Sequence, residues 1–344
     1  MIHRCVAAVF VVLAVVALMP LLAAAQSTEV PRTRWGDPDL QGVWNNGTIT
    51  PMERPEELAA KEFLTEEEAA NLEQERIAHN ERLLQRPARR TAAGGNVDRG
   101  EDGAPGFYNN LWLDYGTTTT GRTSIVIDPP NGRLPDLTPE AHARQTSPEA
   151  QRLRQVAAGR SPAAGPEEMP LAVRCIWYRG IPSLPSGYNN HYHIVQNPDW
   201  VAILQEHIHE VRYIPLDGRP HVSSSIRQYA GDSRGYWEGD TLVVETTNFR
   251  DRTIIRKVPG RLTEALHVVE RYTRTGPDRL DWEFTVTDPG TWTRSWTGSL
   301  PMTRTDDPMF EYSCHEGNYG LYNVLTGSRA TERAAEEAAT QGSK

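Results

Sequence analysis

The sequence is poor in cysteine and lacks the short signatures of several large enzyme classes. Three cysteines occur in 344 residues, without a C-x-x-C pair or zinc-ribbon spacing. No H-E-x-x-H, phosphate-binding loop or dinucleotide fingerprint is present, so metalloprotease, kinase and dehydrogenase activities lack their usual sequence support. The net charge of -9 and the lack of a basic run argue against nucleic acid or an anionic membrane as a partner.

Residues 1–25 have the composition of a secretory signal peptide. A positively charged start precedes an apolar run over 6–22, and three alanines at 23–25 provide a small-residue cleavage boundary. An uncleaved membrane anchor is the alternative, but the run is short for a membrane-spanning helix and contains Pro20. We therefore expect a periplasmic or secreted protein that begins near Gln26 and has no membrane contact after cleavage.

The expected export bears on the oxidation state of the two cysteines of the mature chain. Cys5 would leave with the signal peptide, and Cys175 and Cys314 would remain. In an oxidising compartment, two such cysteines are most simply explained as one disulfide, which would join 174–180 to 312–320. Two separate buried thiols are the alternative.

Strand patterns dominate the chain from 188 onward. Residues 280–286 alternate apolar and polar side chains with a period of two, as in a sheet with one dry and one wet face. Further strand patterns at 191–214, 241–249 and 265–276 are joined by short turns, which predicts an antiparallel meander. Because closure removes exposed edges, we expect a mainly β fold that closes into a lipocalin-like barrel, with a curved open sheet as the alternative.

The pattern divides the mature chain into three parts. An irregular and helical N-terminal region over 26–170 would pack on the outside of the barrel, and it includes a predicted helix at 65–86 that begins after Thr65. The barrel-like domain would cover 171–327. A C-terminal helix or tail would follow at 328–344.

Two long motifs resemble those of a large, mostly uncharacterised family of secreted bacterial proteins. They are "GDSRGYWEGDTLVVETTNF" at 231–249 and "CHEGNYG" at 314–320. The resemblance begins at "WGDPDLQGVW" (35–44) and so covers most of the mature chain. It implies export, and it implies no activity common to the family.

The same family pattern singles out part of a polar cluster, "EHIHEVR" at 206–212. Relatives are similar to E-x-I-H-[D/E]-x-R, which four residues match here: Glu206, His209, Glu210 and Arg212. An upstream pattern, YNN-x-Y-x-I, is matched over 188–194. The pattern does not require histidine at His191, His193 or His207, which argues against a metal site shared by the family.

The histidines nevertheless form two H-x-H pairs that could hold a divalent metal such as zinc. His191 and His193 lie on one predicted strand, and His207 and His209 lie on the next. Both rings of an H-x-H pair point to one face of a strand. A turn of even length near 198 would put the two pairs on opposite faces, and a turn of odd length would put all four on one face. Our first hypothesis has no cofactor, and metal binding is the alternative.

Acid–base chemistry is the preferred interpretation of the cluster. His209 would be the base and Arg212 would hold an anionic oxygen. The assisting groups are expected to be Glu206, His221 and His315, and the substrate-contacting residues to be Tyr192, Glu210, Trp237 and Tyr319. In a regular strand, His207 and His209 would share one face while Glu206, Glu210 and Arg212 would share the other, so a bulge is needed to bring base and arginine together. A charged edge strand without chemistry is the plain alternative.

These observations favour an exported enzyme that acts on a small hydrophobic or aromatic molecule in a barrel pocket. Its reaction would be of the lyase, isomerase, hydratase or cyclase type. A metal-dependent enzyme that uses the H-x-H histidines is one alternative, and a non-catalytic small-molecule-binding protein is another.

Overall fold

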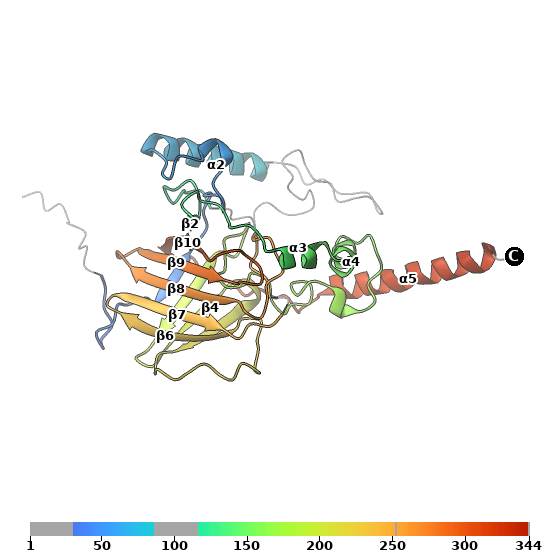
Figure 1. The fold of residues 1–344 in the computed structure, drawn as a ribbon. Coiled ribbons are helices and arrows are strands. Elements are labelled where there is room, and N and C mark those ends of the chain that lie inside the picture. The colour runs from blue at the N-terminus through green and yellow to red at the C-terminus, as the bar shows by residue number, and fades with distance from the viewer. Residues whose placement is uncertain (1–29, 86–115, 252, 343–344) are drawn as a thin grey trace, which may run out of the picture.

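The computed structural model describes residues 30–85, 116–251 and 253–342, and the side chain of His209 lies outside the description. The predicted signal peptide at 1–25 also lies outside the described residues. The described chain forms a large curved antiparallel sheet with helices at its margins (Figure 1). No helix within these ranges is both long and apolar enough to cross a membrane.

Eleven strands make up the sheet. They are β1 Gly42–Asn45, β2 Val126–Asp128, β3 His191–Gln196, β4 Trp200–Gln205, β5 Glu210–Pro215, β6 Asp232–Glu238, β7 Thr241–Thr247, β8 His267–Arg274, β9 Arg279–Thr287, β10 Trp296–Ser299 and β11 Met302–Thr305. The α-helices are α2 Glu66–Gln85, α3 Pro139–Thr146, α4 Pro148–Ala157 and α5 Tyr319–Gly342. Short 3-10 turns lie at η1 Glu56–Leu58, η3 Pro166–Glu168 and η4 His207–His209.

The sheet order confirms the predicted mainly β, antiparallel fold. It runs β5-β4-β3-β1-β11-β9-β8-β7-β6, with β10 joined to β9 and β2. Strands β5 and β6 are the two ends of this order, and no ladder joins them in the described chain. The structure is therefore a curved sheet, and backbone hydrogen bonds between its end strands do not close it into a barrel in the described chain.

The N-terminal region contributes strands to the sheet as well as helices outside it. Strand β1 pairs with β3 on one side and β11 on the other, so Trp44 faces Tyr192 and Arg304 in the ladders. Strand β2 pairs with β10. Strand β1 was not predicted from the sequence, because a run of four residues is too short to show a period of two.

Large aromatic side chains pack on the buried face of the sheet. Burial alternates along β8 and β9, which places Tyr272 and Trp282 inside with ring centroids 5.9 Å apart. Phe284 and Trp296 are fully buried beside them, 6.0 Å apart and edge to face. These large rings occupy the space in which a barrel pocket was expected, because protein interiors pack to near-crystalline density.

A buried ion pair connects β5, at one end of the strand order, with β8, near the other end. Arg212 donates to both carboxylate oxygens of Glu270 on β8, at 2.6 and 3.2 Å, and the side chains are 3% and 0% exposed. The Tyr272 hydroxyl donates to the same carboxylate at 2.8 Å. Arg212 also contacts the hydroxyls of Ser233 on β6 and Thr246 on β7, each at 3.4 Å. The interior network thus spans β5, β6, β7 and β8.

The predicted helix at 65–86 is confirmed by α2. Glu68 N donates to the Thr65 hydroxyl, and Thr65 N donates to the Glu68 carboxylate, which is a capping box. At the other end of the chain, α5 begins at Tyr319 instead of at 328. Its first turns pack Leu321 and Leu325 against a small cluster near α4, and the rest of the helix projects away from the sheet (Figure 1).

Candidate functional site

The polar stretch 206–212 is a turn followed by a strand, so the prediction of one continuous strand is wrong. Strand β4 ends at Gln205, η4 forms a tight turn, and β5 begins at Glu210. Ile208 in this turn has φ of 59°, a left-handed conformation that is costly for a β-branched residue. The face assignments that assumed a regular strand therefore do not hold for residues 206 to 209.

Strands β3 and β4 pair with the register that an even-length turn predicts. Tyr192 lies opposite Gln205, and this register brings His191 next to Glu206. The Nδ1 atom of His191 is 2.9 Å from the Glu206 carboxylate, and Glu206 N donates to the carbonyl of His191 at 3.1 Å. On the other side of the ring, the Asn45 amide nitrogen lies 3.2 Å from Nε2. The imidazole is thus held between a carboxylate and an amide.

Glu206 is buried and is nevertheless stabilised in its ionised form. Its side chain is 6% exposed. Burial, the largest influence, would raise its pKa, but the hydrogen bonds and charge of His191, with help from Asn189, lower the pKa below its usual value. A carboxylate that stays ionised at neutral pH therefore lies beside an oriented imidazole.

This pair lies on the wall of a cavity of about 830 Å³. Its lining residues come from two parts of the chain: Ala172, Val173, Tyr188, Asn189, His191 and Glu206 from one, and Phe310, Glu311, Tyr312, Ser313, Cys314, Glu316, Gly317 and Asn318 from the other. Three glutamates, three large aromatic rings and no lysine or arginine are among them. The cavity has a volume typical of small-molecule sites, and its described lining is acidic and aromatic.

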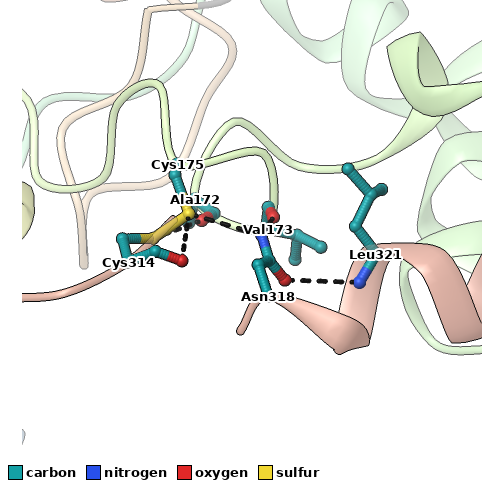
Figure 2. Close-up of a disulfide and its surroundings, with 6 residues drawn as sticks. All are labelled: Ala172, Val173, Cys175, Cys314, Asn318 and Leu321. Carbon is teal, nitrogen blue, oxygen red and sulfur yellow. Dashed lines mark hydrogen bonds between the residues drawn. A yellow bond between two sulfur atoms is a disulfide. The ribbon is translucent and has the colours of Figure 1, made fainter. Parts of the chain in front are cut away.

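The disulfide between Cys175 and Cys314 joins the two halves of the cavity wall, which confirms the predicted pairing (Figure 2). Next to it, the Asn318 amide donates to the Val173 carbonyl at 2.9 Å. The Asn318 side-chain oxygen accepts from Leu321 N at 3.4 Å and so caps the start of α5. The C-terminal wall is therefore attached covalently and by hydrogen bonds.

An aromatic stack lies next to the pair and centres on His207. The rings of Tyr178 and Tyr312 lie 4.0 and 4.4 Å from the imidazole centroid, and the ring of Tyr188 lies at 5.6 Å. His207 is 3% exposed. Burial, assisted by the positive charge of Arg179, lowers its pKa from 6.5 to about 3, so the ring is neutral at physiological pH.

Most of this arrangement was not predicted from the sequence. Tyr178, Tyr188, Tyr312 and Arg179 were not expected at the site, because they come from irregular segments that show no period. The disulfide prediction was the available signal, since it already placed 174–180 beside 312–320.

The predicted site residues are only partly brought together. Glu206 lines the cavity. Arg212 instead forms an ion pair with Glu270 in the interior of the sheet and is not among the lining residues. Tyr192 is also in the interior, where its hydroxyl donates to the Ser183 carbonyl at 2.7 Å. The side chain of His209, the predicted base, lies outside the description.

The remaining predicted residues lie elsewhere. His221 pairs with Asp232 at 2.8 Å, Trp237 packs against the core, and Glu210 is half-buried at the start of β5. His315 and Tyr319 are exposed near the start of α5, and neither is among the cavity-lining residues.

The stretch 231–235, "GDSRG", matches the G-x-S-x-G pattern of serine hydrolases without forming their nucleophile elbow. In those enzymes the serine lies on a sharp turn between a strand and a helix. Here Ser233 lies within β6, is buried, and has its hydroxyl 2.9 Å from that of Thr246. Its side chain is part of the sheet interior, so the match is a feature of the strand sequence.

The H-x-H histidines do not converge in the described structure. His193 is exposed opposite Leu204, His191 pairs with Glu206, and His207 lies in the aromatic stack. Among the described side chains, which exclude that of His209, no group of three or more histidine, cysteine, aspartate or glutamate residues is placed to hold a metal ion.

The chain matches no protein-family model, and no curated protein matches it.

Proposed function

We propose that this protein is an exported enzyme that performs cofactor-free acid–base chemistry on a small aromatic or hydrophobic molecule. The observation that carries the proposal is the pairing of an ionised Glu206 with His191 on the wall of an aromatic-lined cavity. Paired titratable groups of this kind are suited to proton transfer. The disulfide supports an oxidising compartment as the place of action.

In the proposed reaction, Glu206 is the proton acceptor. It would take a proton from the substrate, while His191 donates a hydrogen bond from Nδ1 and so fixes the carboxylate. Returning that proton to another substrate atom gives an isomerisation, and delivering it to a leaving group gives an elimination. The rings of Tyr188, Phe310 and Tyr312 would bind the substrate by stacking.

The scaffold in this proposal is a barrel-like sheet of the lipocalin type. Its support is the network of Arg212, which reaches from β5 to β6, β7 and β8 across the interior. Closure would make the wall behind the cavity rigid, which a catalytic pair requires.

A non-catalytic amine-binding protein is the second candidate. The Nε2 atom of His191 already accepts from Asn45 when Nδ1 donates to Glu206, and the cavity combines carboxylates with aromatic rings. Such a combination binds cationic ligands through charge and cation–π contacts. In this case Glu206 would hold an ammonium group and transfer no proton.

One pair of variants separates these functions. Small aromatic molecules with and without an amine group are screened for thermal stabilisation of the oxidised protein, and ligands are then tested for turnover by mass spectrometry. For an enzyme, Glu206→Gln retains ligand binding and loses turnover by about a hundredfold or more. Glu311→Gln, which neutralises an exposed carboxylate on the same cavity wall, is the matched control.

Each result has a definite meaning. Loss of amine binding in Glu206→Gln, without turnover in the wild type, supports the binding protein. Full turnover in Glu206→Gln would refute the acid–base proposal.

A further inference from the structure

A second, smaller cavity is lined in part by residues 184–187, which directly precede Tyr188 in the chain. It has a volume of about 310 Å³. Its lining consists of Thr48, Ile49, Thr50, Pro51, Met52, Arg76, Ile125, Leu184, Pro185, Ser186, Gly187, Arg256 and Lys257. Three cations and no carboxylate are among these residues, although the protein as a whole carries a net charge of -9. The smaller cavity is thus positive in an acidic protein.

The three cations of this cavity have no acidic partner among the described residues. About half of the other arginines of the described chain do have one, as in the pairs of Arg122 with Glu62 and Arg271 with Glu238. Arg76, Arg256 and Lys257 form no such pair. Crowded like charges without a counterion attract an anion from solution.

Arg256 is held in place from two sides. Its backbone N donates to the Arg179 carbonyl at 2.9 Å, and its guanidinium lies 4.4 Å from the centre of the Tyr178 ring. The chain at Gly180 packs so closely that a Cβ atom there would lie 1.8 Å from the Ile254 carbonyl oxygen. The guanidinium is therefore pre-positioned, and little freedom is lost when it binds an anion.

Lys257 follows directly in an uncommon conformation. Its φ of 67° is in the left-handed region, which non-glycine residues rarely adopt outside functional or tightly constrained sites. Partial burial, and then the charges of Arg256 and Arg179, lower the pKa of the ammonium. An anion next to this ammonium would relieve that repulsion.

We propose that the cavity between Arg76, Arg256 and Lys257 is an anion-binding site for a carboxylate or phosphate group of a small molecule. Guanidinium and ammonium groups together supply several charge-assisted hydrogen bonds to such a group. Gly187 contributes no side chain to the lining of the cavity. The proposal concerns binding alone and does not depend on the acid–base function of Glu206.

The test is calorimetric titration of the oxidised full-length mature protein with inorganic phosphate and, separately, with acetate, at constant ionic strength in chloride. Lys257→Gln and Arg256→Gln are expected to weaken binding about tenfold or more, since each removes a charged donor. Arg279→Gln removes the same charge from an exposed side chain that pairs with Asp281, and it serves as the control with unchanged affinity. Circular dichroism confirms that each variant is folded, and Lys257→Gln alone suffices if Arg256→Gln does not fold.

The two titrations identify the group that is bound. Saturable binding of phosphate or of acetate that is lost in Lys257→Gln supports the site. The anion that binds more tightly identifies whether the site prefers a phosphate or a carboxylate group. Absence of saturable binding for both anions, or affinities that stay within about twofold of wild type in the folded variants, would overturn the proposal.

Discussion

Replacing His207 by phenylalanine should make the protein less sensitive to acid. The neutral imidazole lies in an aromatic slot between Tyr178 and Tyr312, and its Nδ1 atom is buried without a hydrogen-bond partner in the described structure. Phenylalanine fills the same slot with a ring of similar size. The substitution therefore removes a titrating group without removing a hydrogen bond from Nδ1.

The direction of the effect follows from proton binding. The pKa of His207 is lowered in the folded state from 6.5 to about 3, so between these values the unfolded chain binds more protons than the folded chain. Stability is therefore lost as the pH falls below the unfolded pKa, and the loss continues down to the folded pKa. At pH 5, about 1.5 pH units below the unfolded pKa, the cost is about 2 kcal/mol relative to pH 8.

Urea unfolding of the oxidised protein at pH 8 and at pH 5 measures this cost. All groups other than residue 207 contribute nearly equally to wild type and variant, so the difference between the two proteins isolates the imidazole. We expect His207→Phe to lose about 2 kcal/mol less than wild type on going to pH 5. His193→Gln, which removes an exposed imidazole from β3, is the control and should follow wild type.

The assay can also refute the reasoning. If His207→Phe and wild type lose the same free energy of unfolding between pH 8 and pH 5, within about 0.5 kcal/mol, His207 is not buried as a neutral ring.

Three further substitutions test the framework of the fold by urea unfolding. Glu270→Gln leaves the buried charge of Arg212 unpaired and should cost about 3–5 kcal/mol, and a cost below about 1 kcal/mol would mean that water reaches the pair. Gly180→Ala forces a Cβ against the Ile254 carbonyl at a φ of +87° and should cost about 2 kcal/mol or more, so wild-type stability would contradict the close packing. Cys175→Ser opens a loop with a sequence separation of 139 and should cost about 2–5 kcal/mol, and an unchanged midpoint would disprove its contribution.

The sequence predicted those parts of the fold that carry local signals. The alternation at 280–286 identified a strand with one buried face, and the cap at Thr65 identified the start of α2. The expected export and the small number of cysteines predicted the disulfide between Cys175 and Cys314. Each of these predictions needed only a short stretch of chain or a simple count.

The candidate site could not be predicted in the same way. One left-handed residue, Ile208, converts the middle of an apparent strand into a turn, and no sequence period reports a single backbone angle. The turn moves His207 into an aromatic stack. Glu206 lies beside His191 because of the register of β3 and β4, and the sequence left that register open between two turn lengths.

The position of β1 has a consequence for how the protein reaches its folded state. The first strand of the described chain, β1, is flanked by β3 and by β11, the last described strand, so the middle of the sheet is built from distant parts of the sequence. Until β11 has been synthesised, β1 has one partner and an open edge, which is exposed to pairing with other chains. A topology of such long-range contacts folds slowly, so completion of the sheet should be the late step in the maturation of this protein.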